Sequence, residues 1–566
     1  MQAQAFPFVA FLSVVWLVCV CALLSACKAV LQWGLQARSE EENSFQALSF
    51  LSLILVTAMA VLWVTPYQAS NLGISDSVEY AVAAERMLNQ GTYSLQIEGH
   101  NLPPRYAPWF SALFIVPSMI LTSPNLGNSI WPILVFAMLG VSIAFCVGRR
   151  LSGNWGGILS AFAVLLDPGY RYFSKFPMTD VPSAVLVLLI LTLCLVVTTR
   201  KEKSDWSFLT LGVLCALVAS LRITSVLVVV PVLWAAVFAV EKKGMLKRLL
   251  LALSPVLFFF AVQAVYQLAI FGSPLRSGYE FWVPWPYDFF SKVFSLNYLA
   301  TNLATLSLHT PTVLFVVLFL AGWPVLREKQ GAARLDREAF FRFFRLVGYF
   351  AVPLVALYLL YFYSTSRFYL PMSVALYALI GSFIGAFLGP IEKHRVPALV
   401  CLLVIAAGAA GWRSSAPIDP PARRIAADIM ARTTANDALI VTGLDPVYLE
   451  PLVLRGTTRT VLPISRRIEY ASKVVAWAPL YYREPYPQDL TTLPREYLLE
   501  AGGRDVVSSV ALDGDDVVGT ALASGRPVYI ETSALEPGEL KQFTDRFTML
   551  EMGKGLFQVT GTWGNS

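Results

Sequence analysis

Long apolar stretches separated by short polar segments fill the first 412 residues of the chain. An α-helix needs about 20 mainly apolar residues to cross a bilayer, and on this basis the pattern predicts about twelve crossings. They fall roughly at residues 6–33, 46–66, 129–148, 155–167, 181–199, 207–220, 223–240, 249–271, 309–326, 343–363, 368–389 and 396–412. Residues 109–121 are also apolar, but this stretch is short and follows three prolines. We therefore expect a juxtamembrane or re-entrant helix there.

Basic residues test this assignment, because they concentrate in the cytoplasmic loops of membrane proteins. If residues 109–121 do not cross, the basic clusters all fall on one side of the membrane. These clusters are Lys28 with Arg38, Arg149 with Arg150, residues 200–203, 242–248 and 327–345, and Lys393 with Arg395. The assignment predicts a multi-pass protein of the cytoplasmic membrane. The opposite, extracytoplasmic side then carries the loops 67–128, 168–180, 272–308 and 364–367 and the C-terminal region.

The pattern changes after Trp412 to that of a small α/β domain. A proline-rich linker at 417–421 precedes predicted helices at 422–432, 446–455 and 536–547 and predicted strands at 438–442, 460–463, 527–532 and 555–560. Neither a glycine-rich phosphate loop nor a nucleophile elbow is visible, which favours a cover or an acceptor-binding module. We divide the chain into an extra N-terminal helix with its cytoplasmic loop (1–45), a transmembrane domain (46–412) and an extracytoplasmic domain (413–566).

Composition supports this fold class, a polytopic α-helical membrane protein with a small C-terminal α/β domain. Hydrophobic residues make up 56% of the chain and charged residues 14%, and the mean hydropathy is +0.60. The net charge of +6 is explained by the loop clusters, so nucleic acid is not an expected partner. The seven cysteines lie in or beside apolar stretches, which indicates neither a disulfide framework nor a zinc site. Residues 24–27 resemble a lipoprotein cleavage box, but a basic segment does not precede them, so we expect no cleavage.

Two carboxylates stand out on the predicted outer side. Asp76 opens a predicted helix that ends before Gly91, and Asp76 with Glu79 fits a capping box. Asp180 lies at the outer mouth of a predicted crossing, where it fits an N-cap. Capping alone does not account for the elaborate loop that follows Asp76, with about 60 residues between the flanking crossings. A catalytic role for both carboxylates is the alternative, since charges near a bilayer are costly and often functional.

Four cations accompany these carboxylates. Arg222 interrupts a continuous apolar stretch, and Arg367 lies at the outer end of another crossing. Each is either an arginine that reaches to the interface or a partner of a phosphate or carboxylate. Lys175 lies close to Asp180 and, with Arg171, forms a positive patch around it.

The order of the outer motifs resembles that of GT-C-fold glycosyltransferases. The motifs are Asp76-x-x-x-Tyr80, Pro103-Pro104-Arg105-Tyr106, Met178-Thr-Asp180-Val-Pro182, Ser220-Leu-Arg222-Ile-Thr224, Phe271-Gly-Ser-Pro-Leu-Arg-Ser-Gly-Tyr279 and Arg367-Phe-Tyr-Leu-Pro371. Together they span nearly the whole membrane part, and they are closest to the bacterial branch akin to protein mannosyltransferases and the lipid A aminoarabinose transferase. The resemblance implies a GT-C-like membrane domain that moves a sugar from a polyprenyl-phosphate donor to an acceptor on the outer membrane face.

The resemblance also implies roles for residues. The family's first acidic position corresponds to Asp76, whereas a neighbouring family glutamate is Ser77 here and the nearest acid is Glu79. A family lysine before a proline corresponds to Ala107, and Arg105 is the cation that would replace its charge. Asp76 is then the candidate base and Asp180 a second catalytic residue that orients the sugar, assists the base or helps to hold a divalent cation. The implied substrate contacts are Glu79, Tyr80, Arg105, Tyr106, Lys175, Arg222, Tyr279 and Arg367.

Several alternatives stay open at the level of sequence. The acceptor is a lipid, a glycan or a protein, and the sugar is not specified. The aromatic residues Trp282, Trp285 and Tyr287 either line the groove for the donor's tail or form a membrane belt. The rival function is a transporter or flippase of lipid-linked sugars, but the sequence shows one clear helix interruption, at Arg222, and no internal repeat.

Overall fold

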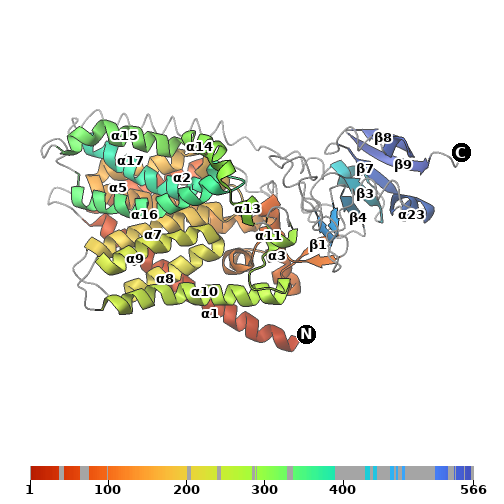
Figure 1. Cartoon of the computed structure of the whole chain (residues 1–566), viewed down its shortest axis with the longest axis horizontal. Coiled ribbons are helices and arrows are strands. Elements are labelled where there is room, and N and C mark those ends of the chain that lie inside the picture. The colour runs from red at the N-terminus through yellow and green to blue at the C-terminus, as the bar shows by residue number, and fades with distance from the viewer. Residues whose placement is uncertain are drawn as a thin grey trace.

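The computed structural model describes residues 2–36, 44–63, 75–97, 100–199, 205–238, 244–282, 287, 290–327, 335–388, 428–433, 437–442, 459–463, 467–469, 475–477, 517–532, 541, 543–553 and 555–562. The predicted crossing at 396–412 and the helix at 446–455 lie outside these ranges. A bundle of long helices forms one part of the molecule, and a mixed sheet forms the other (Figure 1).

The long helices follow the predicted apolar stretches closely. They are α1 (Gln2–Leu35), α2 (Ser44–Trp63), α5 (Trp131–Leu166), α7 (Asp180–Thr199), α8 (Asp205–Leu221), α9 (Val229–Phe238), α10 (Met245–Phe271), α15 (Thr310–Arg327), α16 (Arg337–Leu360) and α17 (Leu370–Leu388). Among the described residues, six helices are long and apolar enough to cross a bilayer when the whole stretch 126–166 is counted once. A seventh span results if the pair at 296–307 and 311–320, bent by 70°, counts as one. The prediction of a polytopic helical membrane protein is confirmed.

Element α5 is a hairpin of two antiparallel helices. The backbone leaves the helical region at Ser152 and Gly153, and Gly153 adopts a φ of 83°, which glycine tolerates best. A Cβ at Gly148 would lie 2.2 Å from the carbonyl oxygen of Gly156, although residues eight apart in a straight helix are separated by about 12 Å. The predicted crossings 129–148 and 155–167 are therefore separate helices.

Helix α17 packs tightly against the second half of this hairpin. A Cβ at Gly381 would lie 2.2 Å from the backbone nitrogen of Ser160, and one at Gly385 would lie 2.4 Å from that of Gly156. Small residues at helix contacts allow backbones to approach closely, as is common within membranes. This packing fixes the start of α17, and with it Arg367, relative to the rest of the bundle.

Basic residues gather at one end of the bundle, which we call the basic end. Arg149 in the α5 turn donates a hydrogen bond from Nη1 to the carbonyl oxygen of Gly34 at the end of α1, at 2.5 Å. Arg342 Nη1, near the start of α16, donates to Thr198 O at the end of α7, at 2.7 Å. Lys247, in the first turn of α10, pairs with Asp205, where α8 begins, at 2.6 Å. Because α7 ends here and α8 begins here, Asp180 and Arg222 lie at the opposite end, which we call the site end.

Short elements cover the site end. They are α3 (Ser75–Gln90), β1 (Leu95–Ile97), β2 (His100–Leu102), the π-helical turn η2 (Ser111–Ile115), α4 (Val116–Leu121), η3 (Leu126–Ile130), α6 (Pro168–Phe173), η4 (Ile223–Val228), α11 (Gly278–Trp282), α13 (Phe290–Val293), η5 (Leu296–Tyr298), α14 (Leu299–Ser307) and η6 (Ser366–Tyr369). The stretch 109–121 forms η2 and α4, which together are shorter than a membrane span. The break at Arg222 separates α8 from η4 and α9, as the sequence predicts.

The C-terminal part contains a five-stranded sheet in the order β4-β3-β7-β9-β8. Its elements are β3 (Leu439–Thr442), β4 (Thr460–Pro463), α23 (Val517–Ala523), β7 (Val528–Glu531), β8 (Phe547–Gly553) and β9 (Leu556–Thr562), beside a separate hairpin of β5 (Arg467–Glu469) and β6 (Val475–Trp477). Strands β4, β3 and β7 run parallel, whereas β9 and β8 are antiparallel to their neighbours. The predicted α/β class is confirmed. Strand β8 is not predicted by the sequence pattern, which assigns its first residue to a helix.

Candidate active site

Helix α3 carries the first two acidic residues into the interior of the site end. A capping box would require Asp76 to stand just before the first helical residue. The helix begins at Ser75, however, so Asp76 lies inside the first turn. Gly91 ends the helix with a φ of 68°, and its N–H donates to the carbonyl oxygen of Met87, as expected for a C-cap. Asp76 and Glu79 are both buried. Their side chains meet arginines there, so their main role is not helix capping.

Glu79 holds Arg105 in one orientation. Its Oε2 accepts a hydrogen bond from the backbone N–H of Arg105 at 3.1 Å, and its Oε1 accepts one from Nε at 2.8 Å. Arg105 Nη2 lies 2.6 Å from Glu79 Oε1 and 3.0 Å from Asp76 Oδ1. The start of α11 packs directly against the backbone of Arg105, since a Cβ at Gly278 would lie 2.4 Å from the Arg105 carbonyl oxygen. Arg105 is thus fixed from both its backbone and its side chain.

Asp180, at the start of α7, binds two further arginines through one oxygen. Arg222 Nη1 lies 2.6 Å from Asp180 Oδ1, and Arg367 Nε lies 3.0 Å from the same atom. Arg367 also reaches α3, because its Nη2 lies 2.5 Å from Asp76 Oδ2. Arg367 therefore bridges the two candidate catalytic carboxylates, which are 104 positions apart in the sequence.

We call these six residues the ion-pair cluster: Asp76, Glu79, Asp180, Arg105, Arg222 and Arg367. Three carboxylates balance three guanidinium groups, which is how buried charges become tolerable. The cluster opens toward its surroundings at Arg367, whose side chain is 28% exposed, compared with 12% for Arg222 and 4% for Arg105. An incoming anion would meet Arg367 first.

One oxygen of the cluster has no hydrogen-bond donor within the described part of the chain. Asp180 is completely buried, and its Oδ2 has no such partner. A buried carboxylate oxygen without a donor is costly. A hydroxyl or amino group of a bound molecule could supply the missing donor if a neighbouring side chain moved to admit it.

The electrostatic environment keeps Asp76 ionised. Burial by itself would favour the neutral acid, but the guanidinium groups of Arg367 and Arg105 outweigh it and hold the pKa of Asp76 below its usual range. Both carboxylate oxygens are occupied by these arginines. Asp76 is a poor proton acceptor in this arrangement until one arginine moves away.

Aromatic side chains form a wall beside the cluster. The rings of Tyr80 and Tyr106 stack with centroids 4.5 Å apart, and the ring of Tyr279 lies nearly perpendicular to that of Tyr106, with centroids 5.7 Å apart. The wall continues to Tyr287, 5.0 Å from Tyr279, whose hydroxyl lies 2.7 Å from that of Tyr361. The sequence singles out Tyr80, Tyr106, Tyr279 and Tyr287 but gives Tyr361 no role. The only signal for Tyr361 is its position just before the Arg367 motif.

Of the predicted cations, Lys175 lies outside the cluster, whereas Arg222 lies within it and makes an additional contact. Lys175 lies between α6 and α7, is half-buried, and has a pKa lowered by burial and by the nearby Arg171. It is not a member of the ion-pair cluster. Arg222 packs over the ring of Phe368, with its guanidinium carbon 4.9 Å from the ring centroid, so this arginine is held by both an ion pair and a cation–π contact.

The carboxylate oxygens of the cluster are not arranged as the ligands of a metal ion. Divalent cations prefer several oxygen ligands, and no group of three His, Cys, Asp or Glu residues suited to a metal occurs among the described residues. The position between Asp76 and Asp180 is taken by the guanidinium group of Arg367. In this arrangement the carboxylates of the cluster bind guanidinium groups in place of a metal ion.

Comparisons with known proteins support the resemblance seen in the sequence. Residues 103–266 match the family model of dolichyl-phosphate-mannose-protein mannosyltransferases. This range includes Arg105, Asp180 and Arg222 of the cluster. No curated protein sequence matches the chain. The fold and the family match together confirm the resemblance to GT-C-fold glycosyltransferases.

Particular solved structures share this architecture. The chain is similar to the crystal structure of ArnT from Cupriavidus metallidurans bound to undecaprenyl phosphate, with 12% identity, a TM-score of 0.54, and coverage of 92% of this chain and 98% of that chain. It is also similar to the cryo-EM structure of the arabinofuranosyltransferase AftD from mycobacteria, with 15% identity, a TM-score of 0.50, and coverage of 90% of this chain and 37% of that one. At these identities the likeness establishes the fold.

Proposed function

We propose that the protein is an inverting glycosyltransferase that moves a sugar from a polyprenyl-phosphate donor to an acceptor at the site end. The observation that carries this proposal is the ion-pair cluster, in which Arg367 is partly exposed and bridges two buried carboxylates. The family match and the likeness to a protein bound to undecaprenyl phosphate support the donor class.

The donor phosphate would bind first at Arg367. A guanidinium group binds phosphate oxygens through two parallel N–H groups, and Arg367 is the most exposed cation of the cluster. The cluster is electrically balanced, so an added phosphate must compete with a carboxylate for its arginine. Asp76 Oδ2 is the atom that Arg367 would release, because this contact is made by the terminal Nη2, whereas Asp180 is bound by Nε, closer to the backbone.

The released carboxylate can then act as a general base. The acceptor hydroxyl attacks the anomeric carbon, its proton passes to Asp76, and the bond between the anomeric carbon and the phosphate oxygen breaks. The polyprenyl phosphate leaves with the negative charge, which Arg367 and Arg222 stabilise as it develops. One displacement at the anomeric carbon inverts its configuration.

The remaining residues position the substrates. Once Arg367 moves, Asp180 Oδ2 accepts a hydrogen bond from a hydroxyl or amino group of the sugar, and the side chains of Tyr106, Tyr279 and Tyr287 line one side of it. Arg105 is bound by Glu79 and Asp76, so we assign it to holding Asp76 in place and not to direct phosphate binding. This revises the role that the sequence suggests for Arg105 and Glu79.

The site end would face the outside of the cytoplasmic membrane. Support comes from the gathering of Arg149, Arg342 and Lys247 at the basic end, since basic residues favour the cytoplasmic side. The C-terminal sheet lies beyond the site end in Figure 1, on the side of α3 and α11. We propose that this domain covers the site or binds the acceptor, which is a lipid, a glycan or a protein.

The test is an assay of purified full-length protein in liposomes with a radiolabelled polyprenyl-phosphate sugar. Sugar transferred to an acceptor fraction, with equimolar release of polyprenyl phosphate, supports the proposal. Movement of intact donor across the bilayer without bond cleavage would instead identify a flippase. The charges of the described site lie at one end of the bundle, whereas transporters place them near the midplane.

A further inference from the structure

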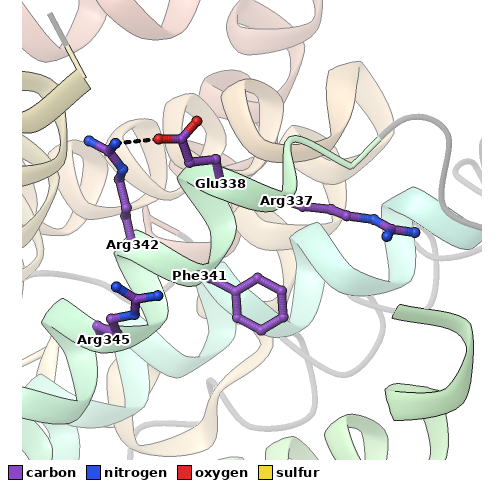
Figure 2. Close-up of a pocket in the computed structure, with 5 residues that line it drawn as sticks. All are labelled: Arg337, Glu338, Phe341, Arg342 and Arg345. Carbon is purple, nitrogen blue, oxygen red and sulfur yellow. Dashed lines mark hydrogen bonds and ion pairs between the residues drawn. The ribbon is translucent and has the colours of Figure 1, made fainter. Parts of the chain in front are cut away.

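A second cluster of arginines lines a cavity at the basic end, far from the ion-pair cluster. The cavity has a volume of about 360 Å³ and is lined by Arg337, Glu338, Phe341, Arg342 and Arg345 of α16. Figure 2 shows these side chains around the first turns of the helix, with Glu338 turned toward Arg342. Three arginines face one glutamate, so the lining carries two net positive charges. We call this site the basic cavity.

The position of the basic cavity is fixed by contacts with two other segments. The N–H of Asp336, just before α16, donates to the carbonyl oxygen of Leu151 in the α5 turn at 2.8 Å. Arg342 donates to Thr198 at the end of α7 and also pairs with Glu338. The cavity thus lies where α5, α7 and α16 meet at the basic end of the bundle.

The face of α16 that carries the cavity changes from basic to apolar one turn after Arg345. Arg337, Phe341 and Arg345 are spaced four residues apart and lie on one face of α16. Tyr349 and Val352 continue this face, and their side chains are 38% and 70% exposed. The face is therefore basic for two turns and apolar for the next two, in the direction of the membrane interior.

We infer that the basic cavity binds the phosphate of an anionic phospholipid in the leaflet at the basic end. The headgroup phosphate would lie between Arg337 and Arg345, while an acyl chain would follow Tyr349 and Val352. Arg342 is already held by Glu338 and Thr198, so it contributes mainly a fixed positive charge. Basic residues at the membrane surface attract anionic lipids, and a cluster of them can bind a headgroup.

This inference differs from the general preference of basic loops for one side of the membrane. That preference predicts no lipid selectivity and equal effects for any basic residue at the basic end. The basic cavity predicts selectivity for anionic lipids that depends on Arg337 and Arg345. Lys247 is a matched control, because it lies at the same end and pairs with Asp205.

The experiment is native mass spectrometry of the delipidated full-length protein, titrated with phosphatidylglycerol or phosphatidylcholine. We expect tighter binding of phosphatidylglycerol, with the affinity falling roughly fivefold in Arg345→Gln and again in Arg337→Gln/Arg345→Gln. Arg345→Lys should restore most of the binding, and Lys247→Gln should leave it unchanged. Thermal unfolding of each variant would show that the chain remains folded.

Three outcomes would overturn the inference. They are equal binding of both lipids, an equal loss of phosphatidylglycerol in Lys247→Gln, and displacement of phosphatidylglycerol by millimolar inorganic phosphate. The last result would assign the cavity to a soluble phosphate. The readout is binding alone, so it does not depend on the proposed transferase activity.

Discussion

Replacing Arg367 with glutamine removes the bridge between Asp76 and Asp180. The change deletes the contacts at 2.5 Å to Asp76 and 3.0 Å to Asp180 and leaves three carboxylates facing two arginines. Loss of one partner from a buried ion pair costs about 3–5 kcal/mol, but Arg367 is 28% exposed, so we expect a loss of about 2 kcal/mol of stability. Removing one preorganised donor from a developing negative charge typically lowers turnover by about 100- to 1,000-fold.

The assay compares kcat/KM for release of polyprenyl phosphate by the wild type, Arg367→Gln and Arg367→Lys in liposomes. The lysine variant keeps the charge but loses the two-nitrogen geometry, so its kcat/KM should fall between the other two. Arg86→Gln is the matched control, because Arg86 lies on α3 and bonds to Asn101 outside the cluster. A kcat/KM for Arg367→Gln within threefold of the wild-type value would refute the bridging role.

Three further predictions follow from the same contacts. In a pH profile, the acidic limb of kcat/KM should move to higher pH in Arg367→Gln, because the cation that holds the pKa of Asp76 low is gone; an unmoved limb would contradict this. Asp180→Asn should raise KM more than it lowers kcat if this residue mainly orients the sugar, and steady-state kinetics would separate the two effects. Gly278→Ala places a Cβ 2.4 Å from the carbonyl oxygen of Arg105, so both the melting temperature and kcat should fall. Gly348→Ala, in open space within α16, should leave kcat unchanged and should not lower the melting temperature, because alanine favours a helix more than glycine does.

The helices of the bundle could be predicted from the sequence because each crossing is a local property of about 20 residues. Even the turn within α5 was predictable, since the apolar pattern breaks near Arg149 and Arg150. Strand β8 was not, because it pairs with β9 through contacts that its own short sequence does not reveal. Local pattern predicts elements, while pairing between them depends on tertiary context.

The members of the ion-pair cluster were predictable individually but their partners were not. Charges at outer helix ends single out Asp76, Asp180 and Arg367. The bond between Asp76 and Arg367, however, joins residues 291 positions apart, and no local pattern specifies it. The same limit explains why Arg105 resembles a phosphate ligand in the sequence, although in the structure its side chain is held by Glu79 and Asp76.

The most direct test of the central claim is sugar transfer by the Asp76→Asn variant. The protein should remain folded and should still bind the lipid-phosphate donor, because Arg367 and Arg222 remain in place. The transfer rate should fall by about 100- to 10,000-fold, the range that a general base contributes. Transfer at the wild-type rate by this folded, donor-binding variant would contradict the assignment of Asp76 as the base.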